Sequence, residues 1–217
     1  KYYNCMSGSK INVAKQAIDY IKDKLHPEMI LGIGTGSTVN FFIEELKELR
    51  NNFAGAVSSS EASSRLLSEN GIEVFNLNDI SEIAFYIDGA DEVAPNKELI
   101  KGGGGAHTRE KIVASAAKEF ICIVDDSKIV TKLGAFPLPV EVIPESRSLV
   151  ARRIVSMGGV PEYRAGFTTD QGNQILDVKE IDISDPKELE TLLNTIPGVV
   201  DNGIFAFNKP SVVLVSK

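Results

Sequence analysis

Hydrophobic residues in the first part of the chain follow two patterns that alternate. Between Lys10 and Lys24 they recur at the spacing of one helical face, which predicts an amphipathic helix. After Pro27, the continuous apolar run Met29–Gly34 is typical of a short buried strand. The same alternation continues downstream. Helices are predicted over Ser37–Leu49, up to Asn70 and over Arg109–Phe120, and strands within Phe53–Ser60, Ile72–Phe75, Ile83–Asp88 and Ile121–Asp126.

Strands that alternate with helices predict a parallel sheet covered on both faces. In such sheets, ligands bind outside the carboxyl ends of the strands. The polar, glycine-rich stretches "GIGTGST", "SSSEAS", "DGADE" and "DDSK" all come at those ends. The sequence therefore predicts a binding site at this edge of the sheet.

The pattern changes after "FPLPVEVIP". A strand near Val140–Ile143, a helix over Ser146–Met157, two strands around the turn at Gly172, a helix over Pro186–Asn194 and a strand near Val199–Phe207 follow in turn. This β-α-β-β-α-β order is the split βαβ arrangement. We predict an α/β protein in which a Rossmann-like parallel-sheet domain (1–132 plus 206–217) carries a smaller ferredoxin-like α+β domain (133–205). "SVVLVS" is expected to return to the main sheet, and the first few residues to form a poorly ordered tail.

Charge and composition narrow the range of partners. The 217 residues carry a formal net charge of −7, which argues against nucleic acid or an anionic membrane as the main partner. A small phosphorylated ligand needs only one local anion site and fits this charge. No apolar run is long enough to span a bilayer, and the first residues do not resemble a signal peptide.

The numbers and positions of cysteine and histidine residues indicate whether the protein can bind a metal ion and in which cellular compartment it lies. Cys5 and Cys122 match no metal or redox spacing, so we interpret them as reduced thiols of a cytoplasmic protein. With His26 and His107 as the only histidines, a histidine-rich metal site cannot form. We predict no metal and no cofactor.

The turn "GIGTGST" joins a predicted strand to a predicted helix. Backbone N–H groups at a helix N-terminus, with glycines that allow close approach, form an anion site. The turn is neither a Walker loop nor a dinucleotide fingerprint, because no Gly-Lys-Ser/Thr and no third glycine follow. The alternative is a tight turn in which Ser37 only caps the next helix. The other polar turns at the same edge favour monophosphate binding by Thr35, Gly36, Ser37 and Thr38.

The stretch "YIDGADEVAPNKELIKGGGGAHTREKI" places charged residues around a glycine run. Asp88 and Asp91 lie close together just past a strand, and two carboxylates this close repel each other. One of them is therefore expected to have a raised pKa or a cationic partner such as Lys101. The alternatives are an ordinary strand-end turn for the acids and a solvated surface position for the lysine.

The four consecutive glycines can wrap their N–H groups around an oxyanion, or they can form a flexible linker. Glu110 lies near the start of the next helix, where it either complements the helix dipole or acts as a general base. A carboxylate base, a cation and N–H donors together suit proton transfer between carbons next to a carbonyl, and this chemistry needs no cofactor.

Together these motifs resemble the A type of ribose-5-phosphate isomerase. "GIGTGSTV", "AVSSSEAS", "YIDGADEV", "IKGGGGAHTREKI", "ICIVDDSK" and "FPLPVEVIP" match the family's motifs in order, and the similarity runs from about Lys10 to Phe207. The resemblance implies a metal-free enzyme of the pentose phosphate pathway that interconverts ribose 5-phosphate and ribulose 5-phosphate. It also implies a homodimer or a homotetramer.

The resemblance also implies roles for individual residues. Glu110 corresponds to the catalytic base, Asp88 and Asp91 to the acids for ring opening and hydroxyl protons, and Lys101 to the lysine that steadies the enediolate. The substrate contacts that it implies are Lys10, Thr35, Gly36, Ser37, Thr38, Gly89, Ala90, Gly102, Gly103, Gly104 and Lys128.

Two positions depart from the family's more common "GGGAALTREK", because Gly105 and His107 replace an alanine and a leucine. We interpret His107 as a structural residue, since an apolar residue usually packs there. Two alternative functions stay open on the residues alone. One is a sugar-phosphate sensor without a catalytic base, and the other is a related enzyme such as an amino-sugar-phosphate deaminase or a coenzyme A transferase.

Overall fold

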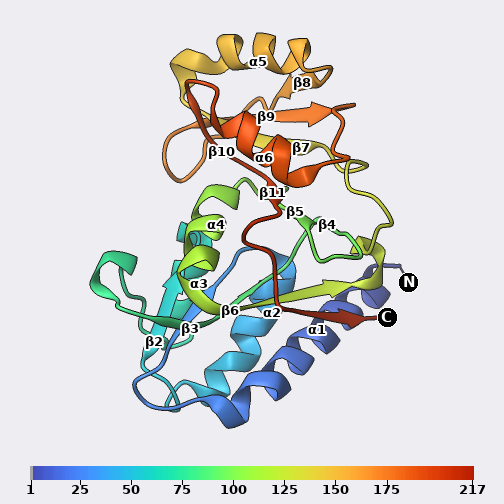
Figure 1. Ribbon diagram of the computed structural model, residues 1–217. Coiled ribbons are helices and arrows are strands. Elements are labelled where there is room, and N and C mark those ends of the chain that lie inside the picture. Colours follow the sequence, from blue (N-terminus) through green and yellow to red (C-terminus); the bar gives the residue numbers. More distant parts are fainter. Residues whose placement is uncertain (1) are drawn as a thin grey trace. The chain divides into compact units, whose positions relative to one another are not determined.

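The computed structural model describes residues 2–217, with side chains from Ser7 onward. This part of the chain forms two compact units (Figure 1). Unit 1 contains residues up to Gly89, Arg109–Lys128 and Pro210–Lys217, and unit 2 contains Ala90–Thr108 and Ile129–Lys209. The division differs from the predicted boundaries mainly in Ala90–Thr108, which groups with the second unit. The predicted domain boundaries (1–132 plus 206–217, and 133–205) stay a prediction.

Unit 1 is built on a five-stranded sheet in the order β12-β6-β3-β1-β2 with every strand pair parallel. Numbered along the chain, this is the doubly wound order 2-1-3-4-5, in which the connection reverses direction between β1 and β3. The strands are β1 (Ile30–Ile33), β2 (Gly55–Ser58), β3 (Ile83–Asp88), β6 (Ala117–Asp125) and β12 (Val212–Ser216). The predicted return of "SVVLVS" to the main sheet is confirmed.

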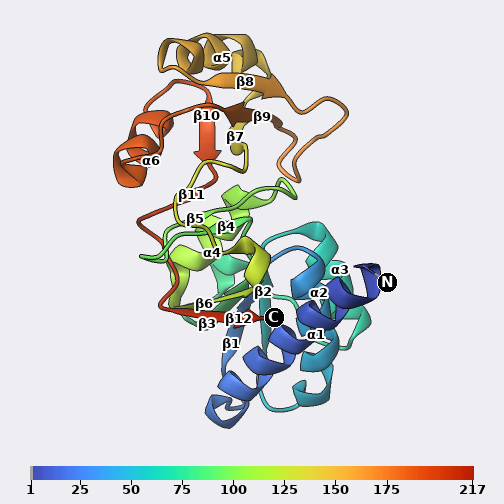
Figure 2. The same cartoon turned by 90° about the vertical axis from the view of Figure 1, so that its right-hand side faces the viewer.

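Helices cover both faces of this sheet. The helices are α1 (Tyr2–Ile21), α2 (Ser37–Leu46), α3 (Glu61–Glu69) and α4 (His107–Ala116). Helices α1 and α2 lie side by side (Figure 2), and their apolar residues share one core cluster with Leu31, Ile33 and Phe85. Because strand residues alternate between faces, Gly32 and Tyr86 lie on the opposite face, where a Cβ on Gly32 would come within 2.8 Å of Val113 of α4.

Unit 2 contains a four-stranded antiparallel sheet in the order β10-β7-β9-β8. Its elements are β7 (Leu138–Val142), α5 (Arg147–Ser156), β8 (Val160–Tyr163), β9 (Gln174–Lys179), α6 (Pro186–Asn194) and β10 (Val199–Asn202). Numbered within this sheet, the strand order is 4-1-3-2, as expected for the split βαβ arrangement. The predicted fold class, a Rossmann-like α/β sheet with a smaller α+β part, is confirmed.

The core of unit 2 lies between the helices and one face of this sheet. Val140 and Val142 of β7 pack in one cluster with Ile154 of α5 and Leu193 of α6. The alternate position Glu141 therefore lies on the other face of the sheet.

Some predicted elements differ from the structure. Helix α1 starts at Tyr2, within the stretch predicted as a poorly ordered tail, and Ser9 hydrogen-bonds Ser216 of β12. Lys1 lies outside the described residues. The segment Ile72–Phe75 forms one bridge, between Val74 and Ala56, instead of a strand.

The predicted helix over Arg109–Phe120 is too long. Helix α4 ends at Ala116 and β6 begins at Ala117, because the next residues pair with β3 despite their helical spacing. A three-stranded sheet of β11 (Ile204–Phe205), β5 (Leu99–Ile100) and β4 (Glu92–Val93) was not predicted. Its two-residue strands are too short to leave a periodic pattern.

No helix in the described part of the chain is long and apolar enough to cross a membrane.

Candidate active site

In unit 1, the loop Gly34–Gly36 leaves β1 at the reversal point of the sheet and leads into α2. Gly36 has φ +121° and is the N-cap residue of α2, so Ser37 is the first helical residue. Ser37 is therefore not the N-cap residue, and anion binding by this turn stays a prediction. The first N–H groups of a helix have no partner within the helix, so the start of α2 can bind an anion.

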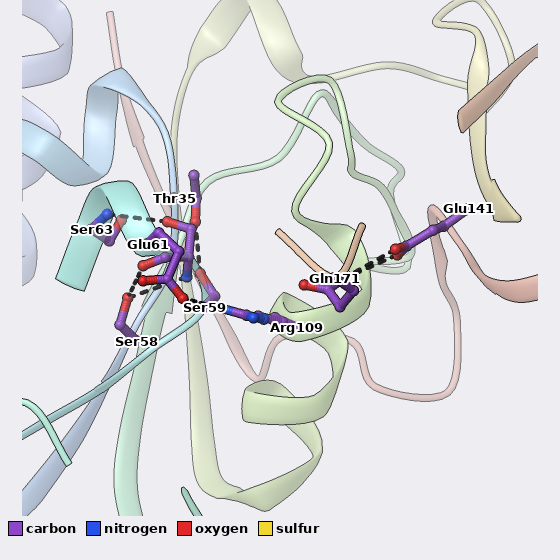
Figure 3. A network of polar contacts seen from close by, with 9 residues as sticks. Thr35, Ser58, Ser59, Glu61, Ser63, Arg109, Glu141 and Gln171 are labelled. Carbon is purple, nitrogen blue, oxygen red and sulfur yellow. Dashed lines mark hydrogen bonds and ion pairs between the residues drawn. The ribbon is translucent and has the colours of Figure 1, made fainter. Parts of the chain in front are cut away.

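Serine side chains hold this loop in place. Ser59 and Thr35 share a hydrogen bond of 2.7 Å between their hydroxyl oxygens (Figure 3). The Ser63 hydroxyl donates to the carbonyl oxygen of Gly34 at 2.7 Å. Ser60 caps α3 by accepting a hydrogen bond from the Ser63 N–H. The motif "SSSEAS" thus supports the neighbouring loop as well as starting its own helix.

Lys10, in α1, reaches the start of α2 from a distant part of the sequence. Its ammonium group donates a 2.7 Å hydrogen bond to the exposed Ser37 hydroxyl. A lysine charge and a hydroxyl therefore lie beside the N-terminus of α2, and all three features favour binding of an anion.

Asp88, the last residue of β3, is fully buried next to this loop. One of its carboxylate oxygens accepts hydrogen bonds from the N–H groups of Thr35 at 3.2 Å and Gly89 at 2.7 Å, and the other accepts the Tyr86 hydroxyl. A Cβ on Gly34 would lie 2.0 Å from the Asp88 carboxyl carbon, so only glycine fits at that position. The glycine after β1 thus makes room for the acid after β3.

Glu110 is in the first turn of α4 and is 4% exposed. Burial, followed by the charges of Asp88 and Glu110, raises the pKa of Tyr86 well above its usual value. The carboxylates of Asp88 and Glu110 therefore both act electrostatically on the Tyr86 hydroxyl. The neighbouring Arg109 forms a 3.0 Å ion pair with Glu61 of α3 (Figure 3).

Lys128 is half-buried in the turn that follows β6. Asp125 closes this turn by accepting hydrogen bonds from the Ser127 N–H, at 2.9 Å, and from the Ser127 hydroxyl. Because β6 pairs in parallel with β3, Lys128 and Asp88 belong to the same edge of the sheet.

In unit 2, the glycine loop (Gly102–Gly105) follows β5 and Lys101. Asp91 accepts a hydrogen bond from the Gly103 N–H at 2.8 Å, and the Gly105 N–H donates to the carbonyl oxygen of Gly102 at 2.9 Å. The glycine run lies inside unit 2 and has defined contacts there. The linker alternative is therefore wrong.

Individual glycines in this loop have distinct surroundings. Gly102 has φ +102°, and a Cβ there would meet the His107 ring at 2.7 Å. A Cβ on Gly103 would meet Asp91 at 2.7 Å, whereas a Cβ on Gly104 would have no neighbour within 4 Å. Gly103 and Gly104 are exposed, so this part of the loop lies at the surface of the unit.

Lys101 is 3% exposed. Its backbone N–H donates to Gly203 at 2.8 Å, and its ammonium group lies 5.6 Å from the centre of the Phe205 ring. A Cβ on Gly203 would lie 2.2 Å from the Lys101 carbonyl oxygen, so this glycine permits the close approach of the two backbones.

His107 is fully buried, and its Nε2 lies 3.2 Å from the carbonyl oxygen of Asp201. This burial and this backbone contact agree with the structural interpretation of the histidine. Among the residues that the structure describes, no group of three or more His, Cys, Asp or Glu side chains could hold a metal ion.

Sequence reasoning missed several residues that support the site. Tyr86 has the periodicity of an ordinary core position, and Ser59 is one polar residue in a serine run. Gly203 lies about a hundred residues from the lysine that it accommodates. Only the position of Ser59, within a motif at a strand end, gave a local signal.

A family profile described as ribose 5-phosphate isomerase A (phosphoriboisomerase A) matches residues 55–217. The chain belongs to this family. The ribose-5-phosphate isomerase A of Legionella pneumophila (strain Corby) is 56% identical over 211 residues, which cover 97% of this chain and 96% of that protein.

Solved structures of the family have the same fold. The crystal structure of ribose 5-phosphate isomerase A from Neisseria gonorrhoeae has a TM-score of 0.93 and 48% identity, over 98% of this chain and 93% of that one. A structure of D-ribose-5-phosphate isomerase in complex with phospho-erythronic acid has a TM-score of 0.88 and 38% identity, over 95% of this chain and 93% of the other.

Proposed function

We propose that this chain interconverts D-ribose 5-phosphate and D-ribulose 5-phosphate, in the non-oxidative branch of the pentose phosphate pathway. The observation that carries the proposal is that unit 1 buries two acids: Glu110 in the first turn of α4, and Asp88 at the end of β3, beside the reversal point of the parallel sheet. Membership of the isomerase family supports this reaction over a sugar-phosphate sensor, a deaminase or a coenzyme A transferase.

In the proposed reaction, Glu110 removes the C2 proton of the open-chain aldose, which leaves an enediolate over C1 and C2. The same carboxyl group returns the proton to C1, and loss of the O2 proton gives the ketose. Asp88 and Asp91 transfer protons during ring opening and between O1 and O2. No step needs a metal or a redox cofactor.

The charge of the enediolate needs donors that are already in position. We assign this role to Lys101 and to the N–H groups of Gly102, Gly103 and Gly104. The phosphate is assigned to Thr35, Gly36, Ser37 and Thr38, with Lys10. Gly89, Ala90 and Lys128 complete the proposed substrate contacts. Support for the phosphate end comes from the start of α2 and the Lys10–Ser37 hydrogen bond.

The test is to mix the purified protein with ribose 5-phosphate and a chelator, and to follow formation of ketose. We expect turnover without added metal. Binding of ribose 5-phosphate without any ketose would favour a sensor and would overturn the proposal.

We also propose a cytoplasmic homo-oligomer, either a dimer or a tetramer. The buried thiol of Cys122 agrees with a reducing compartment. Exposed apolar residues in α5 and β8 of unit 2, such as Val155 and Val160, agree with a contact between copies. Light scattering of the purified protein measures its mass, and a monomer at all concentrations would contradict the assembly.

A further inference from the structure

Arg164, in the connection between β8 and β9, contacts the glycine loop of unit 2. Its two terminal nitrogens donate to the carbonyl oxygens of Gly103 at 3.2 Å and Gly102 at 3.1 Å. No part of the proposed reaction uses this arginine, and it lies about sixty residues beyond the loop in sequence.

Asp177 of β9 holds the guanidinium group from the other side. The Nε of Arg164 donates to one carboxylate oxygen of Asp177 at 2.8 Å, and a terminal nitrogen donates to the other at 2.6 Å. The side chains of Arg164 and Asp177 are only 18% and 23% exposed, so this two-bond pair is partly shielded from water. A planar, bidentate pair of this kind fixes orientation as well as position.

The remainder of the connection is also held. The Arg164 guanidinium lies 5.2 Å from the centre of the Phe167 ring, and a Cβ on Gly105 would lie 2.2 Å from that ring. Glycine at position 105, where the family more often has alanine, therefore makes room for Phe167.

Buried Glu141 of β7 anchors the end of this connection. It accepts hydrogen bonds from Thr169 at 2.7 Å, Asn173 at 3.1 Å and Gln171 at 3.2 Å, the last of which is visible in Figure 3. The connection is thus a fixed segment that can transmit a fixed orientation to the glycine loop.

The carbonyl contacts determine the direction of the N–H groups. In a trans peptide, the C=O of one residue and the N–H of the next point in opposite directions. Arg164 binds the Gly102 carbonyl, and the Gly103 N–H on the other side of that peptide donates to Asp91. By the same geometry, binding of the Gly103 carbonyl directs the Gly104 N–H away from Arg164, toward the Asp91 side of the loop.

We propose that Arg164, held by Asp177, is a positioning residue that orients the glycine-loop N–H groups toward the enediolate oxygens. This inference rests on the proposed function and adds to it two residues that do not touch the substrate. The cationic guanidinium also polarises both peptide groups, which makes their N–H groups better donors.

The test compares Arg164→Met, Arg164→Lys and Asp177→Asn with the wild-type protein. We expect Arg164→Met to lower kcat roughly ten- to a hundredfold, since one lost oxyanion donor costs about that or more. KM should change less than kcat. Arg164→Lys should restore only part of kcat, because an ammonium group cannot bind Asp177 and two carbonyls in one plane. Asp177→Asn should act in the same direction with a smaller effect.

Inhibition by two different anions distinguishes a positioning role of Arg164 from a general loss of structure. Inhibition by inorganic phosphate reports on the phosphate end alone, whereas phospho-erythronic acid also carries a carboxylate that can accept the loop N–H groups. We expect the variants to weaken inhibition by phospho-erythronic acid and to leave that by phosphate unchanged. Lys179→Met is the matched control, because Lys179 also lies in β9 and forms an exposed ion pair with Glu162. It should behave like the wild-type protein.

The inference would be overturned if Arg164→Met kept the wild-type kcat, or if the variants weakened inhibition by both anions equally. If Arg164→Met does not fold, Arg164→Lys and Asp177→Asn carry the same comparison. A wild-type protein without turnover would instead refute the proposed function. In that case, calorimetric binding of phospho-erythronic acid to the same variants still decides whether Arg164 orients the loop.

Discussion

The two units hold their parts of the proposed site in different ways. In unit 1, Asp88 ends β3 and Gly34 directly follows β1, so the sheet itself places them at one edge. In unit 2, the glycine loop follows a two-residue strand. Residues from later in the chain bind the backbone of this stretch: Gly203 contacts Lys101, and Arg164 contacts Gly102 and Gly103. In unit 1, each residue is placed by its position at the end of a sheet strand. The glycine loop instead depends on contacts with residues outside any strand that precedes it.

This difference implies different sensitivities to mutation. Substitutions away from the site in unit 1 should mostly change stability. In unit 2, substitutions far from the glycine loop in sequence can change its shape and therefore turnover.

The largest effect is expected for Glu110→Gln in unit 1. Removing the base should lower kcat by about a thousandfold, within the range for a general base, and should leave binding of phospho-erythronic acid nearly unchanged. Steady-state kinetics and calorimetry measure the two effects. Turnover close to that of the wild-type protein would remove Glu110 from the mechanism.

Lys101→Ala in unit 2 should come next, with kcat lowered roughly a hundredfold through loss of a cation beside the enediolate. Lys101→Met serves as a control for packing, since it keeps the length of this buried side chain. Both variants should be similarly impaired. A change confined to KM would assign Lys101 to substrate binding instead.

Gly103→Ala and Gly104→Ala form a matched pair within the glycine loop. A methyl group at position 103 would meet the Asp91 carboxylate, and one at position 104 meets nothing within 4 Å. We expect a loss of roughly tenfold or more in kcat for Gly103→Ala and at most about a twofold change for Gly104→Ala. Equal effects would show that the contact with Asp91 does not matter.

Ser37→Ala tests the phosphate end of unit 1 and should have the smallest effect. Loss of one hydroxyl donor, about 1 kcal/mol, should raise KM and the inhibition constant of inorganic phosphate about fivefold with little change in kcat. Inhibition assays with phosphate measure this directly. A lower kcat with unchanged KM would move Ser37 to the reacting end of the sugar.

The same difference explains what could be predicted from the sequence. Strands β1 and β3 and the turns after them were predicted because apolar runs and strand-end glycines are local signals. The end of α4 was predicted wrongly, because Ala117 and Phe120 continue the helical spacing but pair with β3. The contacts of Arg164 could not be predicted, since no local pattern connects an arginine to backbone carbonyls about sixty residues earlier.

The direct passage from α4 to β6, with no intervening loop, has a consequence for tolerated changes in chain length. One residue inserted between Glu110 and Ala117 would turn the Glu110 side chain by about 100° around the helix axis. If β6 shifted instead, its inward and outward side chains would exchange faces. Length is therefore as restricted as composition in this stretch, and natural insertions and deletions should be absent from it while they accumulate in surface turns.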